Sequence, residues 1–138
     1  MELVAYKGKD SIGDRFIQSW TGEVYSHCEL RVAGTCYSSS IRDNGVRSKA
    51  INVFTDNWDI YPLTKFSESE VLSYYYRTRY QKYSYFDLVF SQMLNTKFNN
   101  PRAPFCSEWC AEALLIPNGR IYSPTKLVEL IKYIESMK

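Results

Sequence analysis

Residues 26–32 read Ser-His-Cys-Glu-Leu-Arg-Val, and polar and apolar side chains alternate along them. His27, Glu29 and Arg31 fall on one face of an extended chain, while the Cys, Leu and Val between them fall on the other. Alternation with a period of two residues is typical of a strand that buries one face. The segment therefore predicts a β-strand with its apolar side chains in a core.

The chain after this segment turns back on itself. Residues 33–35, Ala-Gly-Thr, form a short turn, and residues 36–41 can return as a second strand. The two segments together predict an antiparallel hairpin. Asp43-Asn44-Gly45 predicts a further turn, because Asn and Gly tolerate positive φ.

Two more strands are predicted in the first half of the chain, at residues 46–53 and 58–63. Pro62 should lie at the end or on the edge of the sheet, because it has no backbone N–H to donate. These segments would complete an antiparallel sheet.

The second half of the chain reads as helices. Ser67 and Glu70 form a capping box, and Ser123-Pro124 starts the last helix, with Pro at the first helical position, where its missing N–H costs nothing. The predicted helices cover residues 67–80, 85–94, 106–115 and 123 onward, with a rigid loop at residues 99–104. Strands followed by helices predict an α+β fold, an antiparallel sheet packed against helices, in a single domain over residues 1–138.

Composition narrows the classes of function. The 138 residues include 17 Lys and Arg against 15 Asp and Glu, a net charge of +2, so we expect no nucleic-acid partner. Apolar runs fall far short of the roughly 18 residues of a membrane span, so no stable membrane insertion is expected. The N-terminus lacks the shape of a signal peptide, which favours a cytoplasmic location and reduced cysteines. The oligomeric state is left open.

Cys106 is the candidate nucleophile. It follows a proline-bearing loop and begins the predicted helix at residues 106–115. The helix dipole and the unpaired N–H groups at that end favour a thiolate and can receive an oxyanion. The alternative is a small buried residue at a helix start. Cys110, one turn further on, is interpreted as core packing.

His27 is the candidate base, because the chain has one histidine and nucleophilic cysteines are commonly activated by an imidazole. Glu29 is a candidate for orienting that imidazole, from the same strand face about 7 Å along the strand. A hydroxyl from Ser38, Ser39 or Ser40 is the rival for this role. A plain solvent-facing strand edge is the alternative for His27 and Glu29 alike.

Two other interpretations are disfavoured. A zinc site formed by the histidine and three cysteines would need His27 and Cys28 to point the same way, and Cys-x3-Cys on a helix is not the spacing of a zinc knuckle. Tyr and Arg alternate loosely over residues 74–80, as in some nucleic-acid surfaces, but on a helix these side chains spread around the axis and mostly pack. We expect no metal and no cofactor.

The motifs Ser26-His27-Cys28-Glu29-Leu30 and Phe105-Cys106-Ser107-Glu108-Trp109 resemble those of the circularly permuted NlpC-type papain-like hydrolases. This group includes YiiX-like bacterial proteins and lecithin:retinol acyltransferase, and small phage-encoded members are the most similar in size. In it the histidine strand precedes the cysteine helix. The segment Tyr122-Ser123-Pro124-Thr125-Lys126-Leu127 is similar to the group's closing helix.

The resemblance implies a permuted papain-like fold and a thiol hydrolase in which Cys106 is the nucleophile and His27 the base. Its substrates would be small peptides, other amides or lipid esters, and acyl transfer is included. Many members place the third polar residue on the strand after the histidine, where this chain has only serines around Ser39, so either Glu29 or a serine would take that role. The alternative is a catalytically weak or inactive binding protein on the same scaffold.

Overall fold

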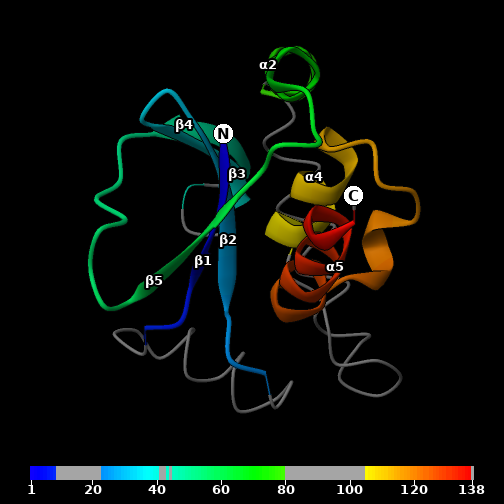
Figure 1. Ribbon diagram of the computed structural model, residues 1–138. Coiled ribbons are helices and arrows are strands. Elements are labelled where there is room, and N and C mark those ends of the chain that lie inside the picture. Colours follow the sequence, from blue (N-terminus) through cyan, green and yellow to red (C-terminus); the bar gives the residue numbers. More distant parts are fainter. Residues whose placement is uncertain (9–22, 41–42, 44, 80–104, 138) are drawn as a thin grey trace, which may run out of the picture.

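The computed structural model describes residues 1–8, 23–40, 43, 45–79 and 105–137. Within these residues five strands form one antiparallel sheet in the order β4-β3-β2-β1-β5 (Figure 1). The strands are β1 (Glu2–Tyr6), β2 (His27–Val32), β3 (Thr35–Ser40), β4 (Gly45–Lys49) and β5 (Trp58–Pro62). The predicted α+β class with an antiparallel sheet is confirmed.

The hairpin predicted from residues 26–41 is present as β2 and β3. Its turn passes through Ala33 at φ 50° and Gly34 at φ 85°. Two successive residues with positive φ match the right-handed twist of the strands they join. The prediction of a strand over residues 46–53 is wrong at its end, because β4 stops at Lys49.

The sequence pattern did not indicate β1. This strand pairs with β2 on one side and with β5 on the other, so it lies inside the sheet. Leu3, Val4 and Ala5 are all fully buried, because both faces of the strand are covered. A strand buried on both faces shows no two-residue alternation. Pro62 is the last residue of β5, an edge strand, as predicted.

Three α-helices lie in the described residues: α2 (Glu68–Thr78), α4 (Phe105–Ala113) and α5 (Pro124–Ser136). The side chain of Ser67 accepts a hydrogen bond from the backbone N–H of Glu70, so the predicted N-cap is confirmed. Ser123 does the same for Lys126, and the helix start predicted at Ser123-Pro124 is confirmed. A short 3-10 helix, η1 (Gly119–Ile121), separates α4 from α5. The predicted helix at 85–94 and the loop at 99–104 lie outside the described residues.

The helices cover one face of the sheet. Helix α4 contacts β2 and β3, α5 contacts β1, and α2 contacts α4 and β4 (Figure 1). The main core lies between these layers and includes Leu3, Leu30, Trp109, Leu127 and Ile131. The opposite face of the sheet carries a smaller cluster formed by Val4, Cys36 and Val53.

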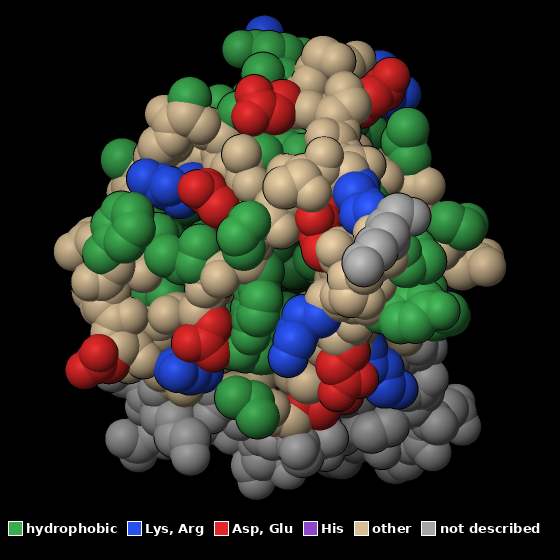
Figure 2. All heavy atoms as spheres, in the orientation of Figure 1, with side chains coloured by type: hydrophobic (Ala, Val, Ile, Leu, Met, Phe, Trp, Pro, Cys, Tyr) green, Lys and Arg blue, Asp and Glu red, His purple; other side chains and the backbone are tan. Residues whose placement is uncertain are grey.

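The surface carries no strong segregation of charge on the face that Figure 2 presents. Acidic and basic side chains are scattered over it, and hydrophobic side chains gather between the strands and the helices. On α2, Tyr74 and Tyr75 pack against the core, while Tyr76 is exposed. Among the described residues, the helices lack the length and the continuous apolar sequence that a membrane span needs.

Candidate active site

The candidate site lies at the end of the β2–β3 hairpin that is remote from its turn. The pairing of these strands runs from Val32↔Thr35 to Leu30↔Tyr37, and residues 27–29 of β2 precede it. There the carbonyl of Cys28 accepts hydrogen bonds from side chains, Ser38 Oγ at 2.8 Å and Cys110 Sγ at 3.9 Å. Side chains of β3 and α4 thus satisfy a backbone group that the strand ladder would otherwise pair.

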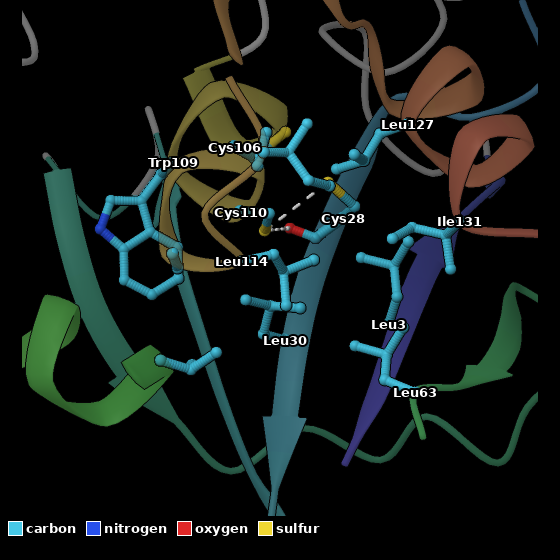
Figure 3. Packing of buried hydrophobic residues seen from close by; sticks show 14 of the residues in the cluster. Leu3, Cys28, Leu30, Leu63, Cys106, Trp109, Cys110, Leu114, Leu127 and Ile131 are labelled. Carbon is cyan, nitrogen blue, oxygen red and sulfur yellow. Dashed lines mark hydrogen bonds between the residues drawn. The ribbon is translucent and has the colours of Figure 1, made fainter. Parts of the chain in front are cut away.

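Helix α4 brings two thiols to this end of β2. Figure 3 shows Cys28 of the strand beside Cys110 of the helix, with Cys106 above them, and the sulfurs of Cys28 and Cys110 are 3.9 Å apart. Cys28 and Cys110 are fully buried, and Cys106 is 3% exposed. All four cysteines are free. Cys110 therefore packs in the core, as predicted from the sequence.

Cys106 and His27 meet at the start of α4. Burial raises the pKa of the Cys106 thiol, but hydrogen bonds from Cys28 and the charge and hydrogen bond of His27 outweigh burial, so this pKa lies well below its ordinary value. Burial lowers the pKa of His27, but the charges of Cys106 and Glu29 and the hydrogen bonds to both raise it to about 10. Each group thus favours the charged form of the other, an imidazolium beside a thiolate.

The first turn of α4 is held by a contact with the segment that precedes α5. Ser107 is fully buried, and its hydroxyl donates a 2.7 Å hydrogen bond to the carbonyl of Tyr122. Cys106 is the second residue of the helix, so its sulfur lies near the positive end of the helix dipole. The His27 side chain remains 21% exposed, so the pair borders the surface.

Glu29 lies in contact with the imidazole of His27. Its carboxylate is fully buried and accepts a hydrogen bond from His27 Nε2. The rival Ser38 is occupied elsewhere, since its hydroxyl donates to Cys28. Burial raises the pKa of Glu29, but His27 and then Arg47 lower it more, so the pKa lies below its ordinary value and the group is ionised. The structure thus brings together all three residues that the sequence singled out.

Arg47, on β4, is the residue that sequence reasoning missed. Its Nη1 and Nη2 each donate a 2.6 Å hydrogen bond to one oxygen of Glu29, and its Nε donates to Asp43 at 2.7 Å. Ser38 pairs with Arg47 across β3–β4. Extending the β2–β3 register by one pair places Ser38 beside Glu29. The two hairpin turns, which set these two registers, therefore held the information that aligns Arg47 with Glu29 across the sheet.

A second polar cluster lies on the β1–β5 side of the sheet. Tyr25, two residues before His27, donates from its hydroxyl to Asp59, and its oxygen is 2.6 Å from that of Tyr61. Lys7 Nζ is 2.9 Å from the other oxygen of Asp59. Lys7 and Asp59 are 39% and 34% exposed, so this cluster opens to solvent.

The described residues contain no group of three or more His, Cys, Asp or Glu side chains arranged to hold a metal ion. Comparison of the chain with family models, curated proteins and solved structures found no match to any of them. The arrangement of Cys106, His27 and Glu29 is therefore the main basis for a functional assignment.

Proposed function

We propose that this protein is a thiol hydrolase that cleaves amide or ester bonds through Cys106 and His27. The observation that carries the proposal is that Cys106, at the start of α4, and His27, held by the buried carboxylate of Glu29, each favour the charged form of the other. A cysteine at a helix start, beside an imidazole that is itself held by a carboxylate, has the geometry of an activated nucleophile. Glu29 acts as the positioning residue of the imidazole.

The mechanism follows from these positions. The Cys106 thiolate attacks the substrate carbonyl, and backbone N–H groups at the start of α4 stabilise the oxyanion. When the intermediate collapses, the bond to the leaving amine or alcohol breaks and the His27 imidazolium gives that group its proton. The neutral imidazole then takes a proton from water, whose hydroxide attacks the thioester and releases a carboxylic acid and the thiolate.

The order of the site residues favours a permuted papain-like fold, since the histidine strand precedes the cysteine helix along the chain. The substrate class that suits this chemistry is a small peptide, another amide or a lipid ester, and an acceptor other than water would make the reaction an acyl transfer. A reducing compartment such as a cytoplasm would suit this chemistry, because oxidation removes a thiolate nucleophile and the four cysteines are free.

The test is selective alkylation followed by peptide mapping. Iodoacetamide at about pH 6.5 should label Cys106 far faster than Cys28, Cys36 or Cys110. The pKa of Cys106 is lowered, those of Cys28 and Cys36 are raised, and Cys110 is fully buried in the core. In a separate sample that has not been alkylated, a nitrophenyl ester should leave an acyl group on Cys106, and Cys106→Ser should abolish this acylation. Equal, slow labelling of all four thiols with no acylated enzyme would contradict the proposal and favour a binding protein on this scaffold.

A further inference from the structure

Arg47 reaches Glu29 from two strands away in the sheet. Ser38 lies between them on β3, and its short side chain leaves room for the arginine to cross. The guanidinium holds both carboxylate oxygens at 2.6 Å, so the plane of the carboxylate is set and Oε2 is aimed at His27 Nε2. Bidentate pairing of this kind combines charge with orientation.

The charges of the buried groups balance only when Arg47 is included. Glu29 and Arg47 form one neutral pair, and the imidazolium of His27 and the thiolate of Cys106 form another. Without Arg47, a fully buried carboxylate would leave the site with an uncompensated negative charge, which is costly in a poorly solvated environment. The site would regain balance by taking up a proton.

This proton can bind to Glu29 or to Cys106, and in both cases the thiolate of Cys106 becomes less favoured. If Glu29 takes it, the imidazolium loses its supporting charge and stabilises the thiolate less. If Cys106 takes it, the thiolate is lost directly. Removal of Arg47 therefore disfavours the thiolate by either route.

The other charged and titratable groups around these contacts do not replace Arg47. Asp43 is 31% exposed and has a second partner in Lys49 at 3.7 Å, so its charge is balanced from the solvent side. Arg31 is paired with Glu2 at 3.3 Å.

The neighbouring thiols do not carry a charge that could replace Arg47. Burial, the largest influence on the Cys36 thiol, raises its pKa to about 12, and Cys28 also has a raised pKa, so both stay neutral near pH 7. Cys110 packs in the core beside Cys28.

We propose that Arg47 is a second positioning residue of the site, which keeps Glu29 ionised and aimed at His27 and thereby maintains the Cys106 thiolate. The inference rests on the proposed function, in which that thiolate is the nucleophile. It extends the site to a linear series of contacts, Arg47–Glu29–His27–Cys106, drawn from β4, β2 and α4.

The experiment is the pH profile of Cys106 alkylation in the whole chain, read by peptide mapping, for wild type, Arg47→Gln and Arg47→Lys. We expect Arg47→Gln to move the midpoint of the profile upward by at least about one pH unit, which is at least about tenfold slower labelling below both midpoints. Arg47→Lys keeps the charge but loses the bidentate fork, so a smaller upward movement is expected and is informative even if Arg47→Gln does not fold.

Arg31→Gln is the matched control, because Arg31 is 19% exposed against 15% for Arg47, lies on the same sheet face and has its own acidic partner. Its profile should coincide with that of wild type. Folded Arg47 variants whose profiles coincide with wild type would overturn the role of Arg47 while leaving Cys106 a reactive thiol. A wild-type Cys106 no faster than the other thiols would instead contradict the proposed function itself.

Discussion

Two ion pairs at the same sheet differ in their access to water. Glu29 and Arg47 are 0% and 15% exposed, and their atoms are 2.6 Å apart. Asp59 and Lys7 are 34% and 39% exposed and 2.9 Å apart. The contacts are similar in length, but water and salt screen only the second pair well. Burial is what lets the first pair control the charge of its neighbours.

The largest expected effect is on stability at the buried pair. Glu29→Gln takes the buried carboxylate away from the Arg47 guanidinium and leaves it only the partly exposed Asp43. Breaking one side of a buried ion pair costs on the order of 3 kcal/mol. Urea unfolding followed by circular dichroism should show this loss in the free energy of unfolding. A loss below about 1 kcal/mol would contradict the view that the pair behaves as buried.

The same variant gives a pH dependence with a defined sign. The pKa of Glu29 in the folded chain lies below its ordinary value of 4.5. The ionised carboxylate therefore contributes stability that is present above about pH 4.5 and is lost as the pH falls through the folded value. The difference in unfolding free energy between wild type and Glu29→Gln should narrow in acid, and a difference that widens would contradict the assignment.

The next effect concerns reactivity rather than stability. His27→Asn removes the imidazolium, so Cys106 returns toward an ordinary thiol, which is about 3% ionised at pH 7. Alkylation of Cys106 at that pH should slow by about 30-fold or more, while the labelling of Cys36 stays unchanged as an internal control. Undiminished labelling of Cys106 would show that His27 does not activate this thiol and would contradict the proposed pair.

The smallest effect is expected at the exposed pair. Asp59→Asn should lower the free energy of unfolding much less than Glu29→Gln does, because it breaks an exposed ion pair and Asn keeps a side-chain oxygen that can accept from Tyr25. The change should shrink further in about 1 M salt, where the screening length falls to about 3 Å. The alkylation profile of Cys106 should not move. A salt-independent loss as large as that of Glu29→Gln would remove the distinction between the pairs.

Local patterns in the sequence predicted much of this fold. The alternation over residues 26–32 placed β2 and sorted its two faces, and side-chain caps at Ser67 and Ser123 located two helices. The sequence did not indicate β1, whose residues are buried on both faces, Leu3 and Ala5 in the main core under the helices and Val4 in the smaller cluster with Val53. That burial is a property of the tertiary structure and leaves no period in the sequence.

The sequence predicted those parts of the site that depend on residues close together in the chain. The single histidine narrowed the choice of base, and Glu29 lies two residues away on the same face. Arg47 depends on two hairpin registers and on a small residue between two strands, so no local motif marks it. The thiol of Cys28 beside Cys106 likewise depends on how α4 packs on β2.

The most direct test of the central claim is the protonation of the one imidazole, followed by NMR of a sample with labelled histidine. Because the chain has a single histidine, the resonance needs no assignment. An imidazolium held between Cys106 and Glu29 should stay protonated through neutral pH and titrate near pH 10, and Cys106→Ser should lower that midpoint. A wild-type midpoint at or below about 6.5, the ordinary value for histidine, would contradict the ion pair.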